Sequence, residues 1–478
     1  MNRTGRASAG PGTGVTAAGG PATGLRVGVV GAGLAGLAAG LDLTRAGCRV
    51  TLLERSRLLG GKATSFHLGD LEMDSGQHVV LGCCSSFLAF AEELGMRGDL
   101  RLQSRFQVLM LADRGPVRLR ALPLPSPLHL ALPFLTFRAL RFGERMGVAR
   151  ALLAARRRDP AAEQSETFAA WLERRGQGPA VRRAFWEPFL VPALNAQLDE
   201  VSAAAGLFVV RTAFLGDRGA ARIGYATVPL ARFAEAAAAR LDEVRLRTAV
   251  THLTADGGRL RSLGAGPEEV AVDAAVMAIP PERLARIGGA SALGLGDLSG
   301  FATTPIADVH LWYEPEPGTG GERGAALPWP GFDFAALAGS PIQWVFVKGP
   351  GYLCCSLSDA RGWVGEPEER LVALGDSELR ARVPALAGRK LVRGVAVRDP
   401  EATFVQTPGL RRPGPGTALA NVCVAGSWTD TGWPATMESA VRSGRAAAAE
   451  LLGKLTSGPA TPAGSAAVAP TAEATARA

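Results

Sequence analysis

The sequence predicts an α/β fold in which a Rossmann-type domain is interleaved with an α+β domain, and three observations support this. A strand, a glycine turn, a helix and a second strand follow one another over residues 25–53, which is the order of a βαβ unit. A further strand, loop and helix lie near the other end of the chain, over 421–452. Helical patterns and other strands fill the middle. The first domain is therefore expected to take segments from both ends of the chain and from its middle.

Each element of the first domain has a local cause. Residues 25–30 (LRVGVV) and 49–53 (RVTLL) are short apolar runs with β-branched side chains, typical of buried strands. The alanine- and leucine-rich stretch 34–46 between them ends at Gly47, a residue type that commonly follows a helix. Further strands are predicted at 244–253, 270–279 and 421–425, and a helix at 436–452.

The second domain is predicted from a change in character. Helical patterns dominate 105–221, and residues 101–183 hold 16 arginines and six acidic residues. The uncharged run 121–137 contains four prolines, which are expected to break a helix. Strands of a separate sheet are predicted at 307–313, 342–347 and 352–357. The resulting boundaries are 25–104, 222–290 and 406–455 for the first domain, 105–221 and 291–405 for the second, and 1–24 and 456–478 for disordered tails.

Composition narrows the class of protein. The 478 residues are 47% hydrophobic and 20% charged, typical of a globular chain with several structural units. The 52 basic residues against 44 acidic ones are almost all arginine and form no basic stripe with aromatic residues, so nucleic acid is not an expected partner. The six cysteines form neither a metal-binding pattern nor a disulfide framework, which predicts no metal site and a cytoplasmic location. No secretory signal or membrane-spanning stretch is predicted.

Three glycines and one acid predict a dinucleotide site. Gly31, Gly33 and Gly36 form a GxGxxG sequence between the first strand and its helix. Here the first glycine permits a tight turn, the second lets the backbone approach a pyrophosphate, and the third lets the helix pack closely on the strand. Glu54 follows the second strand, where a carboxylate can accept hydrogen bonds from ribose hydroxyls.

Three further stretches suit the same site. A glycine pair and a lysine follow the ribose acid, a glycine with polar neighbours comes next, and a glycine-containing loop precedes the helix near the C-terminus. Glycines let the backbone approach a flat ring, and a helix N-terminus offers free N–H groups. Each stretch taken alone is also compatible with an ordinary loop. The residues are Gly60, Gly61 and Lys62; Gly76, Gln77 and His78; and Gly426, Ser427 and Thr436.

Together these motifs resemble the flavin-containing amine oxidase and phytoene desaturase superfamily over residues 25–452. The stretches GAGLAGLAAGLDLTRAG, LLGGKA, DSGQHVVLG and AGSWTDTGWPATMESAVRSG carry the likeness. Within the superfamily, WEPFLVPALN at 186–195 and IQWVF at 342–346 are similar to one branch, the squalene-associated FAD-dependent desaturases or hydroxysqualene dehydroxylases. The resemblance implies an FAD-binding domain interleaved with a substrate domain, as in amine oxidases and phytoene desaturases.

The resemblance also implies bound FAD and assigns residues to it. The first glycines would meet the pyrophosphate, Glu54 the ribose and Val250 the adenine through its backbone. The other stretches would lie along the phosphates, the ribitol and the isoalloxazine ring. Ser427 stands where the family has aspartate, so its hydrogen bond lacks charge assistance and FAD is expected to be held about 1–2 kcal/mol more weakly. The implied FAD residues are Gly31, Gly33, Gly36, Glu54, Arg55, Gly61, Lys62, Gly76, Gln77, His78, Val250, Gly426, Ser427, Thr436, Met437 and Glu438.

The branch resemblance implies a lipophilic C30 isoprenoid substrate. Hydroxysqualene would be reduced to squalene, in squalene and hopanoid biosynthesis, by a hydride from reduced FAD. The departing hydroxyl needs a proton donor, and His78, Glu187 and Asp430 are candidates that spacing alone does not separate. The rings of three tryptophans could face a developing cation, although core packing is the more frequent use of this residue. These are Trp186, Trp344 and Trp433.

Three other functions stay open. A carotenoid or phytoene-type desaturase would run the redox step in the oxidative direction. A flavin amine oxidase would need paired aromatic rings beside the flavin, for which Trp428 and Trp433 are candidates. A flavin-bearing scaffold for isoprenoid enzymes would have a filled or absent substrate tunnel.

Peripheral contact with an anionic membrane is a further hypothesis. The apolar run 121–137 would dip into the surface while the nearby arginines pair with headgroups. Packing of that run in the protein's own core, with solvated arginines, is the alternative. Other enzymes of the squalene pathway are further candidate partners.

Overall fold

The computed structural model describes residues 22–112, 115–314 and 332–456. The tails predicted at 1–24 and 456–478 lie almost wholly outside these residues. At the first described position Ala22 is buried, and the Cys48 thiol contacts its carbonyl at 3.5 Å. The packed chain therefore includes residues before the predicted boundary at 25. At the other end, helix α12 (Met437–Thr456) continues to the last described residue.

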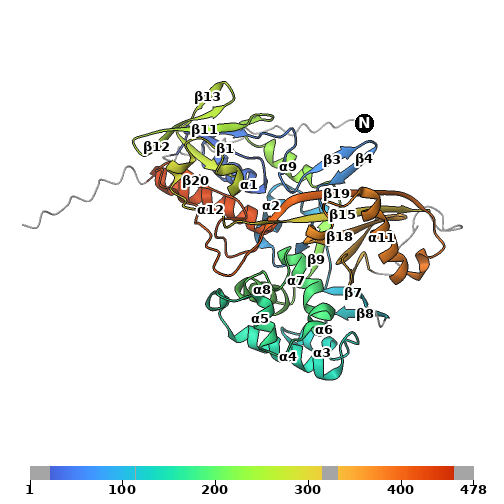
Figure 1. Cartoon of the computed structure of the whole chain (residues 1–478). Helices are drawn as coiled ribbons and strands as arrows, with labels where there is room; N and C mark the ends of the chain where they lie inside the picture. Colours follow the sequence, from blue (N-terminus) through green and yellow to red (C-terminus); the bar gives the residue numbers. More distant parts are fainter. Residues whose placement is uncertain (1–21, 113–114, 315–331, 457–478) are drawn as a thin grey trace, which may run out of the picture.

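Five parallel strands form the central sheet of the first domain, in the order β10-β2-β1-β14-β20. Of these strands, Figure 1 labels β1 and β20. The five strands come from three separate parts of the chain, which is the interleaving expected from the sequence. Helices α1 and α12 pack against each other, and a Cβ at Gly444 would lie 2.1 Å from the carbonyl oxygen of Ala35. The strands are β1 (Arg26–Val30), β2 (Arg49–Leu53), β10 (Glu243–Arg245), β14 (Ala274–Met277) and β20 (Val422–Val424), and α1 is Leu34–Arg45.

Two predicted strands are each divided in the structure. The strand predicted at 244–253 becomes β10 and β11 (Val250–Asp256), because Arg247 between them has a φ of 55° and the chain turns there. The strand predicted at 270–279 becomes β13 (Glu268–Ala271) and β14. In both cases the chain passes between the parallel sheet and an antiparallel sheet of β11, β12 (Arg259–Ala265) and β13. Apolar composition alone does not reveal such a change of sheet.

A seven-stranded mixed sheet forms the second domain, in the order β19-β15-β18-β17-β16-β7-β8. Helix α11 (Glu368–Arg382) covers one of its faces, where Gly375 lies close to Val309 and Leu311. Two of its strands, β7 and β8, belong to the segment for which helices were emphasised, since an apolar run is compatible with either structure. The strands are β7 (Gln107–Ala112), β8 (Gly115–Arg120), β15 (Thr303–Tyr313), β16 (Phe334–Leu337), β17 (Trp344–Gly349), β18 (Tyr352–Ser358) and β19 (Leu391–Phe404).

The helices of residues 128–209 lie in the lower part of the molecule in Figure 1, and α3 and α4 are at the end away from β13. Although the prolines of 121–137 were expected to prevent a helix, α3 (Leu128–Leu135) contains Pro133. Proline cannot donate to the carbonyl four residues earlier, at His129. That carbonyl instead accepts the N–H of Leu122 at 2.9 Å. The other helices are α4 (Phe142–Arg157), α5 (Phe168–Glu173), α6 (Pro179–Val181), α7 (Glu187–Leu194) and α8 (Ala203–Val209).

Shorter elements connect the two domains. Antiparallel strands β3 and β4 form a hairpin, and β5, β9 and β6 form a small sheet. No helix among the described residues is long and apolar enough to cross a membrane. The remaining elements are β3 (Ser65–Leu68), β4 (Leu71–Asp74), β5 (Val80–Leu81), β6 (Leu100–Leu102), β9 (Ile223–Ala226), α2 (Ser85–Glu93), α9 (Ala231–Ala238) and α10 (Pro281–Leu284).

Candidate active site

A cavity of about 930 Å³ extends from the carboxyl ends of the parallel strands to the face of the seven-stranded sheet opposite α11. Residues from both ends of the chain line it, including Gly33 and Glu54 near the start and Gly426 and Thr436 near the end. Its volume is at the upper end of the range usual for small-molecule sites. One continuous space therefore adjoins both domains.

The first glycine motif forms a cradle at one end of this cavity. Gly31 has a φ of 104°, and a Cβ there would lie 2.5 Å from the carbonyl oxygen of Ala278. A Cβ at Gly33 would meet no atom within 4 Å, and Gly33 lines the cavity at the start of α1. No side chain caps this helix and its first turn carries no acid, so its N–H groups and dipole can receive a phosphate.

Gly36 has a different role from its two partners. It is not among the cavity-lining residues, and a Cβ there would lie 2.0 Å from the carbonyl oxygen of Gly31. It therefore permits close packing of α1 on the turn. Direct contact of Gly36 with the pyrophosphate, as the resemblance implied, is not supported by this position.

Glu54 lies where the ribose of a dinucleotide would be expected. Its Oε2 accepts the N–H of Ala32 at 2.8 Å and its Oε1 accepts the N–H of Ser56 at 2.7 Å. A carboxylate offers about four acceptor positions, so it can still accept from ribose hydroxyls. Arg55 and Val250 also line this part of the cavity.

The glycine pair lies directly against the cradle. The N–H of Gly60 donates to the Ala32 carbonyl at 2.8 Å, and a Cβ at Gly61 would lie 3.0 Å from the Gly33 Cα. The ammonium of Lys62, expected near the phosphates, is instead 3.5 Å from an Asp399 oxygen and also donates to the Glu401 carbonyl.

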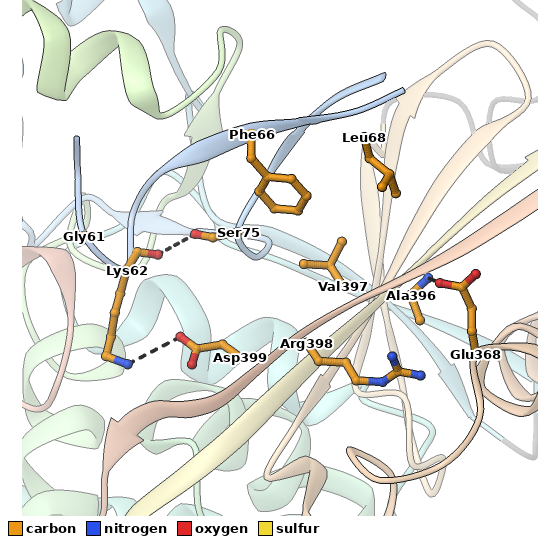
Figure 2. A pocket seen from close by; sticks show the side chains of 10 residues that line it. All are labelled: Gly61, Lys62, Phe66, Leu68, Ser75, Glu368, Ala396, Val397, Arg398 and Asp399. Atoms are coloured by element: carbon orange, nitrogen blue, oxygen red, sulfur yellow. Dashed lines mark hydrogen bonds and ion pairs between the residues drawn. The ribbon is translucent and has the colours of Figure 1, made fainter. Parts of the chain in front are cut away.

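Lys62 therefore joins the two domains. Figure 2 shows its side chain reaching Asp399 while its own carbonyl meets the hydroxyl of Ser75. A smaller cavity of about 420 Å³ lies beside this contact and shares Gly61, Lys62, Ser75 and Asp399 with the larger one.

The C-terminal loop closes the opposite side of the larger cavity. Gly426 has a φ of 144°, and a Cβ there would lie 2.5 Å from the Trp428 ring. Thr436 caps α12, because its hydroxyl accepts the Ser439 N–H at 3.2 Å. Ser427 and Met437 line the cavity beside them.

Glu438 also lines the cavity, but its carboxylate is engaged elsewhere. It is buried and accepts the N–H groups of Ser86 and Phe87 at 3.0 and 2.7 Å, at the start of α2. Arg442 donates to the same carboxylate at 2.6 Å. These bonds tie α12 to α2, so the side chain has a structural role and at most the backbone of Glu438 is free for a cofactor.

Sequence reasoning did not identify Arg412, which holds this loop together. Its guanidinium donates to the carbonyls of Ser427 and Trp433, both at 2.7 Å, and to that of Thr429. Desolvation lowers the pKa of Arg412 to about 10. No motif surrounds this residue in the sequence, and its role follows only from the folded loop.

The segment Gly76–His78 forms a polar edge of the cavity. The Gln77 N–H donates to Asp308 Oδ2 at 3.1 Å, and Lys348 donates to Gln77 Oε1 at 3.1 Å. His78 Nδ1 lies 2.9 Å from the Gly76 carbonyl. Because a carbonyl only accepts, Nδ1 carries the hydrogen, and Nε2 of a neutral His78 is an acceptor. The sequence analysis did not identify Asp308, although a single acidic residue within an apolar strand can be recognised in the sequence as a candidate for a buried functional group.

Aromatic and aliphatic side chains line the far half of the cavity. Phe189 and Phe214 meet edge to face, with ring centroids 5.3 Å apart, and Phe189 also contacts Trp344. The Trp344 N–H is satisfied by the Pro188 carbonyl at 2.9 Å, so its ring can face apolar substrate without an unpaired donor. The aromatic residues lining the cavity here are Phe106, Phe189, Phe208, Phe214, Trp344, Phe346 and Trp433.

Three predicted candidates lie away from this space. Glu187, Asp430 and Trp186 are not among the cavity-lining residues. Trp186 is buried and donates to Gln177 at 3.1 Å, as a core tryptophan does. Burial raises the pKa of Glu187, and Asp430 is exposed. His78 is the one of the three proton-donor candidates that lines the cavity.

The comparisons with known proteins agree with this architecture. The family model for flavin-containing amine oxidoreductases matches residues 34–452, and the chain belongs to this family. It is therefore an FAD-dependent oxidoreductase. The cradle open at Gly33, the carboxylate of Glu54 and the uncapped start of α1 fit the pyrophosphate and ribose of FAD.

Individual relatives narrow the resemblance. The chain is 30% identical to a hydroxysqualene dehydroxylase of Rhodopseudomonas palustris, over 88% of this chain and 96% of that protein. It is 23% identical to a 15-cis-phytoene desaturase of Synechococcus elongatus, over 90% and 96%. Among solved structures, a putrescine oxidase variant superposes with a TM-score of 0.68 at 16% identity, covering 90% of this chain and 99% of that one. The last comparison concerns the fold alone.

No cluster of three or more potential metal-binding side chains occurs among the described residues.

Proposed function

We propose that this enzyme reduces hydroxysqualene to squalene, with FAD as the hydride carrier. The observation that carries the proposal is the single cavity, which joins a phosphate cradle at Gly33 to an aromatic pocket around Phe189 and Trp344. A polar cofactor and a long hydrocarbon chain could lie end to end there. The similarity to the Rhodopseudomonas palustris protein named hydroxysqualene dehydroxylase supports the choice of substrate.

The residues of the chain would bind, orient and shield the reactants. Reduced FAD supplies a hydride when bound. The backbone around Gly33 and the carboxylate of Glu54 would hold its phosphates and ribose. The aromatic half of the cavity would exclude water and take the isoprenoid chain, since burial of apolar surface stabilises the complex by about 25 cal/mol per Å². The face of Trp344 would stabilise positive charge on an allylic carbon, whereas the Trp433 ring already carries the Arg442 guanidinium 4.9 Å from its centroid.

Two alternatives concern the same cavity. A polyene desaturase would use it in the oxidative direction, and similarity to a phytoene desaturase supports that candidate. A flavin amine oxidase would need two rings flanking the amine. Each candidate ring already has an aromatic partner: Trp428 packs against Phe301 at 5.7 Å, and Trp433 against Phe208 at 5.2 Å.

Product analysis separates these functions. The holoenzyme is reduced with dithionite under anaerobic conditions and incubated with hydroxysqualene. Squalene and oxidised FAD are expected in equal amounts. If oxidised enzyme instead desaturates phytoene or ζ-carotene while FAD becomes reduced, the desaturase function replaces our proposal. Hydrogen peroxide formed from amines would favour the amine oxidase.

We also propose peripheral attachment to an anionic membrane through α3. Exposed leucines Leu128, Leu132 and Leu135 project from this helix, and Arg138 and Arg141 beside them are exposed. Both features suit an interfacial helix.

Aromatic packing connects this helix to the cavity. Phe134 on the buried side of α3 contacts Phe185 at 5.0 Å, and Phe185 contacts Phe189 in the cavity wall at 5.8 Å. A lipid-soluble substrate would then enter from the membrane side. Partner enzymes of the squalene pathway would have access to the same surface.

Flotation with phosphatidylglycerol vesicles tests the attachment. The full-length chain is expected to float with these vesicles and less with phosphatidylcholine. The double variant Leu132→Ser/Leu135→Ser should lose flotation, whereas Val392→Ser, at another exposed apolar position, should retain it. Equal flotation of both variants would contradict the role of α3.

A further inference from the structure

The face of the seven-stranded sheet that adjoins the cavity carries a buried polar pair. Asp308 on β15 stands directly opposite Ser356 on β18, and Ser356 in turn stands opposite Trp344 on β17. Directly opposed residues of antiparallel strands project to the same face. Ser356 and Trp344 line the cavity, whereas Asp308 is 1% exposed and lies behind them. The acid is thus one side chain away from the substrate space.

The hydrogen bonding of Asp308 is incomplete. Its Oδ2 accepts the Gln77 N–H at 3.1 Å, while its buried Oδ1 has no hydrogen-bond partner among the described residues. On its other side β19 presents the apolar Val397. An ionised carboxylate with one bare oxygen is costly in such a place, whereas a carboxylic acid can place its hydrogen there.

The surrounding charges do not form an ion pair with this acid in the described part of the chain. Burial raises the pKa of Asp308, and the nearby Ser356 hydroxyl, the Gln77 N–H and the charges of His78 and Lys348 oppose that rise. Burial also lowers the pKa of His310, two residues away on β15, to about 3. The titratable groups near Asp308 are His78 before β5, Lys348 on β17, Tyr352, Cys354 and Cys355 on β18, and His310 on β15 itself. Asp74 on β4 acts on Tyr352 and Cys354.

We propose that Asp308 stores the proton for the departing hydroxyl group and that the Ser356 hydroxyl passes it into the cavity. This role rests on the proposed function. It also answers a need that the other candidates leave, because Glu187 and Asp430 do not line the cavity and His78 Nδ1 is engaged with the Gly76 carbonyl at 2.9 Å.

In the proposed reaction the substrate receives a proton through Ser356 and a hydride at its allylic carbon. The allylic C–O bond breaks with its electron pair on oxygen, and that oxygen takes a proton from Ser356, giving water. Ser356 takes the proton of Asp308 at the same time, leaving a carboxylate. The allylic carbon takes the hydride that reduced FAD supplies, so the alcohol is reduced to the hydrocarbon and the flavin is oxidised. A solvent proton then restores Asp308.

Asp308 is a positioning residue here, since it acts through Ser356. Single-turnover reduction of hydroxysqualene by dithionite-reduced holoenzyme tests both residues. Asp308→Asn is expected to lower the rate constant at least 100-fold and Ser356→Ala at least tenfold, consistent with loss of general acid catalysis. The hydroxysqualene concentration that gives the half-maximal rate constant and the FAD content should each change less than twofold. Ser356→Thr, which keeps the hydroxyl, should recover most of the rate.

Two readouts separate proton storage from a structural role. The wild-type rate should fall as pH rises through the pKa of Asp308, and Asp308→Asn should remove this dependence. The infrared band of a protonated carboxyl group should be present in the wild-type holoenzyme at neutral pH and absent from Asp308→Asn. The control Asp376→Asn alters an aspartate of α11, which packs on the other face of the sheet, and should keep both the rate and the band.

The proton relay and the proposed function are overturned by different results. Absence of the infrared band, or an Asp308→Asn rate within threefold of wild type, overturns the relay and leaves the proposed function standing. Failure of the wild-type enzyme to form squalene overturns the proposed function, and the relay with it, even if the band is present.

Discussion

Backbone atoms form the nucleotide end of the cavity, whereas side chains form its substrate end. The nucleotide end consists of backbone, namely the turn at Gly31–Gly33, the start of α1 and the loop at Gly426. The substrate end consists of side chains such as Phe189, Phe214 and Trp344, which come from α7, a π-helical turn at Val210–Phe214 and β17. A backbone site tolerates no added atoms, whereas a side-chain site can change its shape by substitution. This difference predicts distinct effects of mutations at the two ends.

The largest effect is expected in the glycine cradle. Gly36→Val should prevent folding, because its Cβ would lie 2.0 Å from the Gly31 carbonyl oxygen. Gly33→Val should fold, since its Cβ meets no protein atom within 4 Å, but it should purify without FAD because the side chain would occupy the phosphate site. Soluble yield, circular dichroism and flavin absorbance measure this pair. A yellow Gly33→Val protein would contradict the backbone cradle.

A smaller effect is expected at the substrate end. Phe214→Ala removes part of the aromatic wall, a loss of about 1.5–3 kcal/mol of apolar contact. The kcat/KM for hydroxysqualene should fall about 10- to 100-fold with unchanged FAD content. Phe214→Leu should recover most of it. Loss of FAD from Phe214→Ala would show that the two ends of the cavity are not separable.

Glu54 tests whether one side chain matters at the nucleotide end. Glu54→Gln keeps the shape but replaces one acceptor oxygen by an NH₂ group, which would face the N–H of Ala32 or Ser56. The loss of charge-assisted acceptance costs about 1–3 kcal/mol, so the Kd for FAD should rise about tenfold or more by titration of apoprotein. The matched variant Glu243→Gln, on the neighbouring strand β10, should leave the Kd unchanged.

The smallest effect concerns stability. The raised pKa of Asp308 means that the folded state keeps this proton when the unfolded state, with a pKa of about 3.9, has lost it. Wild-type stability should therefore fall as pH rises from about 4 toward the folded pKa. Asp308→Asn lacks this loss, so its Tm relative to wild type should increase with pH. Calorimetry of both holoenzymes measures the difference, and a constant or decreasing difference would contradict the buried neutral acid.

The two ends also differed in how well they could be predicted. Strands β1 and β2 and the start of α1 lie within a residue of the predicted positions, because glycine spacing and apolar runs are local signals. The predicted strands β15, β17 and β18 were also found. The division of 244–253 between two sheets and the entry of β7 and β8 into the second domain depended on distant partners. The helix containing Pro133 depended on the bond from Leu122 to the His129 carbonyl, which a proline count does not reveal.

The roles of individual side chains also depended on residues distant in the sequence. Lys62 and Glu438 were assigned to the cofactor from their positions in motifs, yet their charged groups bind Asp399 and the start of α2. Arg412 and Asp308 lie in no motif and are defined by groups that the fold brings to them.

The sequence by itself predicted a dinucleotide-binding turn and the interleaving of the two domains, because glycines at a tight turn leave a readable spacing, and the resemblance of its motifs implied the family and FAD. Only the tertiary structure decided which side chains line the cavity and which acid lies behind it. A glycine turn is made by neighbours along the chain. The substrate wall and the pair Asp308–Ser356 are made by strands about 50 residues apart, whose register appears only when the sheet forms.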